Sequence, residues 1–308
     1  MINLDKAGLR IVGMPPKDLA AFMISSFALA ALVDAWFHLV GEGVTDPAAL
    51  SLLGLLWGLL RMYAPTAGAL LALKLSGRSL RGELASYLSI GGGAVLHYLA
   101  APLLVYFALG VYVLLGLAAG LVDLGKPERL LLSQLQRLQP TATAELARLL
   151  LLVQVLSAYI AAVTINAFFA LGEEIGWRGY MYRRLGSQPN LRSIVGIGVA
   201  WGLWHSTAIG LLGHNYPALR WAGVPLFTLL CVVLTAIMLL LVARAQSILP
   251  AVSLHGALNA LWGFTVLVTV PEGAEGEAIG GLGALGLVSL AITYLVVHKL
   301  LAKVQSRR

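Results

Sequence analysis

The sequence predicts an all-α membrane protein, a bundle of about eight transmembrane helices, and three observations lead to this prediction. Of the 308 residues, 59% are hydrophobic and 11% are charged, whereas soluble domains have about 25% charged residues. The mean hydropathy is +0.87. Eight apolar stretches are long enough to cross a bilayer, which takes roughly 20 helical residues. This composition excludes a disordered chain, a disulfide scaffold and a soluble nucleic-acid-binding protein, so we expect no nucleic-acid partner.

The apolar stretches follow one another with short connections. We expect spans at about 18–41, 48–75, 86–121, 148–177, 193–212, 223–243, 249–270 and 279–300. Because no separate soluble domain fits between them, residues 1–308 are predicted to form a single integral-membrane domain. The first residues do not resemble a cleaved signal peptide. The connection at about 122–147 mixes charges with leucines, which predicts a short amphipathic helix on the membrane interface, ended by Pro140.

The distribution of basic residues predicts the orientation of the bundle. With both termini in the cytoplasm, 15 of the 21 Lys and Arg residues fall on inner segments and five on outer ones, while Arg61 lies within a span. Such an excess is expected on the cytoplasmic side. Splitting the 86–121 run at Pro102 into two spans would reverse everything that follows. We therefore expect one long, kinked third span and cytoplasmic termini.

Ionisable residues within membrane spans are costly and usually mark a functional cavity. The predicted spans hold Asp34, His38, Arg61, His97, Glu173, Glu174, His205 and His255. Glu174 and Arg178 are four residues apart, so they share a helix face and can form an ion pair. Glu173 points about 100° away from Glu174 on the same helix. This spacing predicts a structural role for Glu174 and leaves Glu173 for chemistry.

Two further four-residue spacings place polar groups on later spans. Trp201 and His205 share a face of the fifth predicted span, and His255 and Asn259 share a face of the seventh. A carboxylate, two imidazoles and an amide can supply a base, a proton donor and donors for an oxyanion. These residues therefore indicate a hydrolytic site, which their positions along the spans predict in the cytoplasmic half of the bundle.

These motifs, in this order, resemble the CPBP family of CAAX-prenyl-protease and bacteriocin-processing intramembrane endopeptidases, which includes the Ras-converting protease. The motifs are Glu173-Glu174-x-x-x-Arg178, Trp201-x-x-x-His205 and His255-x-x-x-Asn259. The resemblance covers the core from about 150 to 265, and the first three spans match only loosely through residues 65–69. Trp201 stands where the family more often has Phe.

The resemblance implies a glutamate-dependent endopeptidase that hydrolyses a peptide bond of a membrane-associated substrate. Glu173 and His205 would activate water, while His255 and Asn259 would stabilise the tetrahedral oxyanion. Glu174 and Arg178 would give structural support to the site. These roles are what the family implies for the matching positions of this sequence.

A zinc-dependent version of the same hydrolysis is the main alternative, and the family has carried the label metalloprotease. His205, His255 and Glu173 could form a three-ligand zinc site with an open position for water. The sequence lacks a His-Glu-x-x-His helix, however, and Asn259 accompanies His255 as a donor. We therefore expect no cofactor and no metal ligand, with zinc as the alternative.

A non-proteolytic scaffold or a transporter of the same fold is a further alternative. A transporter is expected to show broken helices and paired halves, but the sequence shows no internal repeat. His38 and His97 are expected to make structural hydrogen bonds. Asp34 could pair with His38 or serve as the counter-ion of Arg61. The sequence assigns none of these four residues a functional role.

The expected partners are a peptide or protein substrate at the membrane and the lipid bilayer itself. Short loops and a composition rich in Leu and Ala favour a prokaryotic plasma membrane. The sequence does not reveal the cleaved bond, whether a prenyl group is recognised, or the oligomeric state.

Overall fold

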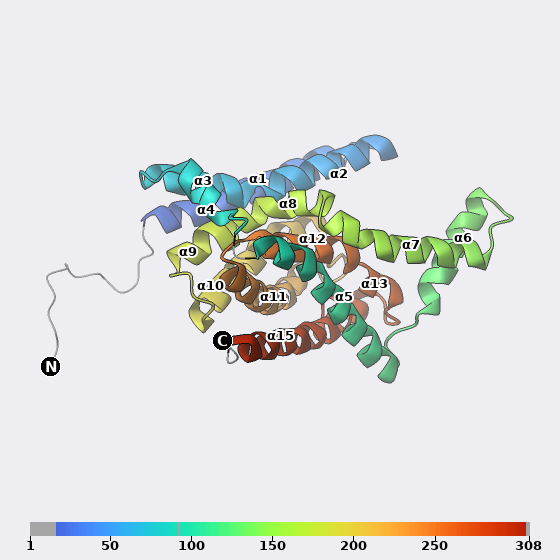
Figure 1. Ribbon diagram of the computed structural model, residues 1–308. Coiled ribbons are helices and arrows are strands. Elements are labelled where there is room, and N and C mark those ends of the chain that lie inside the picture. The colour runs from blue at the N-terminus through green and yellow to red at the C-terminus, as the bar shows by residue number, and fades with distance from the viewer. Residues whose placement is uncertain (1–16, 92, 306–308) are drawn as a thin grey trace, which may run out of the picture.

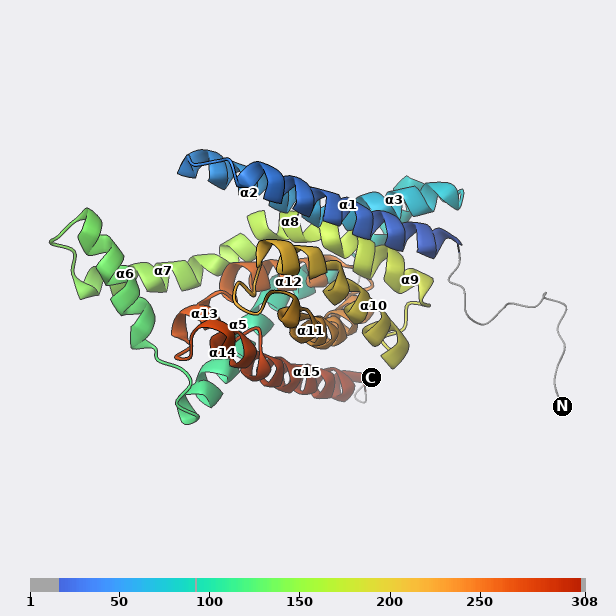
Figure 2. The same ribbon diagram turned by 180° about the vertical axis from the view of Figure 1, so that it is seen from behind.

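The computed structural model describes residues 17–91 and 93–305, and it confirms the predicted all-α membrane fold. This part of the chain contains no β-strand and has eight helical segments long and apolar enough to cross a membrane. These are Lys17–Gly41, Pro47–Leu75, Ala94–Ala118, Ala144–Ala162, Leu191–Leu212, Arg220–Ala245, Leu249–Val268 and Gly273–Ala302. The beginning of the first and the end of the last lie at the same end of the bundle (Figures 1 and 2).

The first half of the chain supplies one side of the bundle, a helix that packs against the second half, and a projection from the end of the bundle. Helix α1 (Lys17–Gly41) runs beside α2 (Pro47–Met62) and α3 (Ala64–Leu75), which together make the second span (Figure 1). A short α4 (Leu80–Tyr87) precedes α5 (Ala94–Ala118). Helices α6 (Gly125–Leu138) and α7 (Ala144–Ala162) extend beyond the other helices in both views (Figures 1 and 2).

The second half of the chain supplies the centre of the bundle. It contains α8 (Ile165–Glu174), a π-helix η1 (Ile175–Met181), α9 (Tyr182–Arg184), α10 (Leu191–Trp204), the π-helix η2 (Ala208–Leu212) and the 3₁₀-helix η3 (Arg220–Ala222). These are followed by α11 (Gly223–Ala245), α12 (Leu249–Leu261), α13 (Phe264–Val268), α14 (Gly273–Ile279) and α15 (Ala284–Gln305). The spans that contain α11 and α12 are each 61% buried, against 11% for the span of α7. Helices α11 and α12 therefore form the core.

The predicted third span differs from the structure at its beginning. Helix α5 begins at Ala94, because Gly93 has the positive φ of 79° that favours glycine and separates α5 from α4. Pro102 lies inside α5, which continues through it as one helix of 25 residues. The prediction of a single span across Pro102 is therefore confirmed, whereas the start at residue 86 was wrong.

The predicted fourth span, 148–177, is wrong because the helix breaks in its middle. Helix α7 ends at Ala162, and α8 begins again at Ile165 after an irregular Thr164. Helix α12 crosses this break closely: a Cβ on Gly256 would lie 2.5 Å from the Ala162 carbonyl oxygen. The two glutamates of the first motif therefore lie on a separate short helix inside the bundle, and not at the end of a long span.

The predicted amphipathic helix forms as α6, and it ends at Leu138, two residues before Pro140. Two ion pairs connect it to its neighbours: Arg148 Nε lies 2.7 Å from Glu128 Oε2, and Lys126 Nζ lies 2.9 Å from Glu272 Oε1. These contacts connect α6 to α7 and to the residue before α14, and so hold it at that end of the bundle. Its location at a membrane interface stays a prediction.

The orientation in the membrane also stays a prediction, and two exposed serines at opposite ends of the bundle test it. Ser133 lies on α6 and Ser187 follows α9. If the termini are cytoplasmic, a membrane-impermeant maleimide added to intact cells will label Ser133→Cys and will spare Ser187→Cys until the membrane is permeabilised. The only native cysteine, Cys231, is buried, so the unmodified protein is the control. Labelling of Ser187→Cys alone in intact cells would reverse the predicted orientation.

Candidate active site

The helix that carries Glu173 is held deep in the bundle by close backbone contacts. Thr66 Oγ1 donates a hydrogen bond of 2.6 Å to the Gly172 carbonyl oxygen. A Cβ on Gly172 would lie 2.6 Å from the Met62 carbonyl oxygen, so only glycine allows α8 to approach the α2–α3 junction this closely. As a result Glu173, next in the chain, is buried at the centre of the protein with 2% of its surface exposed.

The chain changes helix type directly after the two glutamates. Residues Ile175–Met181 form a π-helix, and every one of them is buried. A π-helix is rare and occurs most often at functional sites. Glu174 and Arg178 remain within reach of each other across this change. The predicted ion pair forms, with Arg178 Nη1 at 3.0 Å from Glu174 Oε1 and no exposure of either side chain.

Glu173 has one partner and one free oxygen. Trp201 Nε1 donates a hydrogen bond of 2.6 Å to Glu173 Oε2. The other oxygen, Oε1, makes no hydrogen bond with the described residues and is not among the fully buried polar atoms. Since Glu173 lines a cavity, this oxygen is accessible to water there. The carboxylate is thus oriented by the indole and free on the cavity side.

His205 has a defined tautomer, because its ring hydrogen-bonds to a backbone carbonyl. Its Nδ1 lies 2.8 Å from the Trp201 carbonyl oxygen. A carbonyl only accepts, so Nδ1 carries the proton and Nε2 carries the lone pair of the neutral ring. The rings of Trp204 and Phe227 pack against the imidazole at centroid distances of 4.7 and 4.6 Å. His205 is therefore held as an acceptor at the cavity wall.

His255 lies at the end of a buried chain of charges. Its Nδ1 is 2.9 Å from Glu174 Oε1, the same oxygen that accepts from Arg178. Arg178 also donates to Thr235 Oγ1 at 3.0 Å, and its guanidinium carbon lies 4.1 Å from the centroid of the Trp201 ring. Because the carboxylate accepts, Nδ1 of His255 donates, and a protonated His255 would have Nε2–H available for another acceptor.

A cavity of about 580 Å³ brings four of the predicted site residues to one place. Glu173, His205, His255 and Asn259 all line it. Asn259 is exposed and makes no hydrogen bond with the described residues, one helical turn beyond the buried His255. The remaining lining is largely apolar and aromatic, and the volume lies within the range of ligand-binding pockets. Glu174 and Arg178 are packed behind this lining.

The cavity extends toward one end of the bundle. Its lining includes His214, Asn215 and Pro217, which connect η2 to η3, and Leu282, which follows α14. The predicted topology places both connections on the outer side. With cytoplasmic termini the cavity would therefore face outward, whereas the sequence predicted a site in the cytoplasmic half. The side of the membrane on which the cavity opens stays untested and depends on the orientation.

A second buried ion pair contributes Arg61 to the lining of the same cavity. Arg61 Nε is 2.9 Å from Asp34 Oδ1, so Asp34 is the counter-ion of Arg61. Trp57 Nε1 and Thr207 Oγ1 also donate to Asp34, at 2.8 and 2.5 Å. The alternative pairing of Asp34 with His38 is wrong, because His38 turns toward Glu42, with Nε2 3.5 Å from Oε1.

His97 lies apart from the cavity lining. Its Nδ1 is 2.9 Å from the Gly93 carbonyl oxygen, at the beginning of α5. This contact is the structural hydrogen bond that was expected of a lone histidine.

The sequence did not indicate three of the contacts that organise the site. They are the Trp201 indole bonded to Glu173, the Thr235 hydroxyl bonded to Arg178, and the Arg61 guanidinium in the cavity lining. Trp201 and Arg61 were visible as unusual residues, but their partners are 28 and 27 positions away in the chain. The spacing of Thr235 from Arg178 carries no periodic signal.

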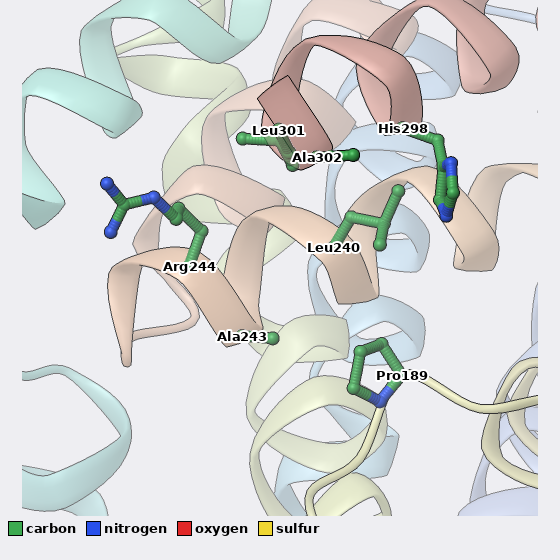
Figure 3. A pocket seen from close by; sticks show the side chains of 7 residues that line it. All are labelled: Pro189, Leu240, Ala243, Arg244, His298, Leu301 and Ala302. Atoms are coloured by element: carbon green, nitrogen blue, oxygen red, sulfur yellow. The ribbon is translucent and has the colours of Figure 1, made fainter. Parts of the chain in front are cut away.

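A second, smaller hollow of about 270 Å³ lies between α11, α15 and the loop before α10. Figure 3 shows Arg244 and His298 on opposite sides of it, with the apolar side chains of Leu240, Ala243, Leu301 and Ala302 between them. Its lining includes no carboxylate and none of the seven motif residues. The larger cavity is therefore the candidate active site.

The residues of the zinc alternative are not arranged as a ligand set. Within residues 17–91 and 93–305, no group of three or more His, Cys, Asp and Glu side chains is placed to hold a metal ion. Glu173 and His255 make hydrogen bonds to Trp201 and Glu174 through Oε2 and Nδ1, respectively. The absence of a cofactor stays a prediction, with zinc as the alternative.

The protein is thus an all-helical membrane protein in which a carboxylate, two imidazoles and an amide line one internal cavity. Residues 153–261 match the model of the family described as Rce1-like, type II CAAX prenyl endopeptidase. This segment contains all seven motif residues and confirms the resemblance. The similarity to this family is limited to residues 153–261. No curated protein matches the chain.

Because the Arg178–Glu174 ion pair is buried, removing its arginine should lower the stability of the fold more than removing the arginine of an exposed pair. In Arg178→Ala, Glu174 keeps a buried charge that has lost its cation, which costs about 3–5 kcal/mol. We expect a clearly lower melting temperature and yield in detergent, measured by differential scanning fluorimetry. The matched control is Arg148→Ala, whose exposed pair with Glu128 should leave the melting temperature almost unchanged. An Arg178→Ala protein as stable as the control would show that the arginine does not support the fold.

Proposed function

We propose that the protein is an intramembrane endopeptidase that hydrolyses a peptide bond of a membrane-associated substrate. One observation carries the proposal: Glu173, His205, His255 and Asn259, from three separate helical segments, line one cavity inside the segment that matches the CAAX endopeptidases. A scaffold needs no such convergence. Broken helices such as the one interrupted at Thr164 also occur in transporters, but the sequence shows no internal repeat of the kind that builds their paired halves.

In the proposed reaction, Glu173 and His205 activate a water molecule. Glu173 Oε1 is free on the cavity side, and Nε2 of neutral His205 is an acceptor. Glu173 takes one proton from the water while His205 accepts a hydrogen bond from the other, and the oxygen attacks the carbonyl carbon of the peptide bond. Glu173 then returns its proton to the amine, which leaves as the carbon–nitrogen bond breaks. General acid–base catalysis of this kind contributes about 10²–10⁴-fold.

The same proposal assigns the oxyanion to α12. The Asn259 amide is exposed to the cavity and has no other partner among the described residues, so it can donate to the oxygen as negative charge develops. His255 can donate from Nε2 when both ring nitrogens carry a proton, since its Nδ1 is directed at Glu174. Arg178 keeps Glu174 in place. It is a positioning residue, since no part of its side chain reaches the cavity.

The substrate that we propose is a peptide or protein segment in the bilayer, processed at a prokaryotic plasma membrane without a cofactor. Its side of entry follows from the orientation of the chain. With cytoplasmic termini, the connection at 213–217 places the cavity mouth on the outer side, and with the opposite orientation the mouth faces the cytoplasm. The maleimide labelling of Ser133→Cys and Ser187→Cys distinguishes the two.

Glu173→Gln tests the role of the base. The amide is nearly the same size and can keep a partner in Trp201, but it cannot accept a proton from water. We expect turnover to fall by about 10²–10⁴-fold while the melting temperature stays close to that of the wild type. The measurement is cleavage in proteoliposomes, with a proteomic comparison of wild-type and Glu173→Gln cells used to find the peptide that accumulates uncleaved. Normal processing by Glu173→Gln would leave the scaffold or transporter as the better interpretation.

Asn259 and His255 distinguish the metal-free site from the zinc alternative. Removing one oxyanion donor typically lowers turnover by about 10²–10³-fold. Asn259→Ala and His255→Ala should each lower kcat by that factor with KM nearly unchanged, because the charge appears only in the transition state. The double variant should lose less than the product of the two losses if both groups serve one oxygen. These kcat and KM values are measured on one reporter peptide.

The zinc alternative predicts a different pattern for the same variants. His255→Ala would remove a ligand and abolish activity, Asn259→Ala would have a mild effect, and a chelator would inactivate the wild-type enzyme until zinc was restored. A mild Asn259→Ala variant would contradict the oxyanion assignment. We expect the purified enzyme to keep its activity in the presence of the chelator.

A further inference from the structure

Arg61 is a buried cation that the mechanism above does not use. It lies in the middle of the α2–α3 span, is 3% exposed, and lines the cavity. No other Lys or Arg side chain contributes to the lining of this cavity among the described residues, and Glu173 is the only carboxylate that does so. A permanent charge in a largely apolar wall is costly, so its contacts show what it can bind.

Two of the three guanidinium nitrogens of Arg61 make hydrogen bonds with the described residues. Nε donates to Asp34 Oδ1 at 2.9 Å, and Nη2 donates to the Trp204 carbonyl oxygen at 3.0 Å. The guanidinium carbon lies 3.9 Å from the centroid of the Trp204 ring. Nη1 makes no hydrogen bond with the described residues, yet it is not among the fully buried polar atoms. Because Arg61 lines the cavity, Nη1 is the part of the side chain that a ligand there can reach.

Asp34 fixes the guanidinium without using all of its binding capacity. The carboxylate accepts from Trp57 and Thr207 as well as from Arg61. The two neutral donors stabilise the ionised carboxylate and fix its position, and Nη1 of Arg61 makes no bond to it. Asp34 and the Trp204 ring therefore hold the fork of N–H groups in one orientation, which lowers the entropy lost when a ligand binds.

Two backbone contacts place Arg61 between the elements that carry Glu173 and His205. Met62 follows Arg61, and a Cβ on Gly172 would collide with the Met62 carbonyl oxygen. Helix α2 therefore contacts α8 at the residue before Glu173. On the other side, Nη2 of Arg61 holds the carbonyl of Trp204, the residue before His205. A group bound at Nη1 therefore lies in the part of the cavity where water would be activated.

We propose that Arg61 binds the free C-terminal carboxylate of the peptide substrate, and this inference rests on the proposed function. A carboxylate that enters an apolar cavity needs a compensating cation, and Arg61 is the permanent cation of the lining. Guanidinium N–H groups match carboxylate oxygens in geometry and charge. Glu173 repels the same group, which orients the chain end toward Arg61 and the preceding peptide bonds toward the base. Arg61 thereby selects peptides with an unmodified C-terminus.

The test is a binding measurement in the Glu173→Gln background, where the peptide stays intact. The probe is a fluorescein-labelled apolar hexapeptide with a free C-terminal carboxylate, compared with the same peptide as its C-terminal amide. Fluorescence anisotropy of the detergent-purified protein gives the two Kd values. We expect the acid to bind about 10–100-fold more tightly than the amide, the range for a hydrogen bond to a charged group.

The Asp34→Asn/Arg61→Gln double substitution, made in the same background, removes both charges together and leaves no unpaired buried ion. It should bring the acid to the affinity of the amide and leave the affinity of the amide nearly unchanged. Arg148→Gln is the control for loss of an arginine outside the cavity and should keep the preference. Melting temperatures of all variants confirm that they are folded. Equal affinities for acid and amide in Glu173→Gln, no binding of either peptide, or a preference that survives the double substitution would overturn the proposal.

Cleavage by the wild type separates this inference from the proposed function. A preference for the acid that depends on Arg61, in a protein that cleaves neither peptide, would support the carboxylate site and count against the protease. Cleavage of acid and amide at equal rates and equal affinities would keep the protease and overturn the role of Arg61.

Discussion

Buried charge in an apolar bundle is the constraint on which the rest of the structure depends. Each ionised group inside the helices needs a partner of opposite charge or several hydrogen bonds, because no water compensates it there. Glu174 Oε1 accepts hydrogen bonds from Arg178 and His255, and the Asp34 carboxylate accepts from Arg61, Trp57 and Thr207. These two networks connect segments far apart in the chain. One connects α1 with α2 and with the segment after α10, and the other connects α8 with η1 and α12.

The short helix α8 and the π-helix after it carry Glu174 and Arg178 of the first network. Helix α7 ends at Ala162, and after the break at Thr164 the chain continues as α8 into the bundle (Figure 1). Glycine then permits close contact on both sides, at Gly172 against α2 and at Gly256 against the break. The result is a helix surrounded by other helices, with Glu174 turned into the packed interior and Glu173 turned toward the cavity.

The division between supporting and reacting groups follows from what each polar atom can reach. Arg178 and Glu174 are fully enclosed, so their chemistry is limited to each other, Thr235 and His255. Glu173, His205 and Asn259 each keep a polar group on the cavity side. Arg61 combines both properties, because two of its nitrogens support Asp34 and Trp204 while the third faces the cavity. The cavity therefore offers a base, donors and a cation within one largely apolar wall.

The sequence by itself determined the membrane class, the number of spans and the pairing of Glu174 with Arg178. These depend on hydropathy along the chain and on helical periodicity, which are local properties. Only the tertiary structure decided the break before α8, the bond from Trp201 to Glu173, the choice of Arg61 over His38 as the partner of Asp34, and the end of the bundle toward which the cavity extends. Each of these depends on which helices lie side by side. Contacts between residues 27 or more positions apart leave no periodic trace in one sequence.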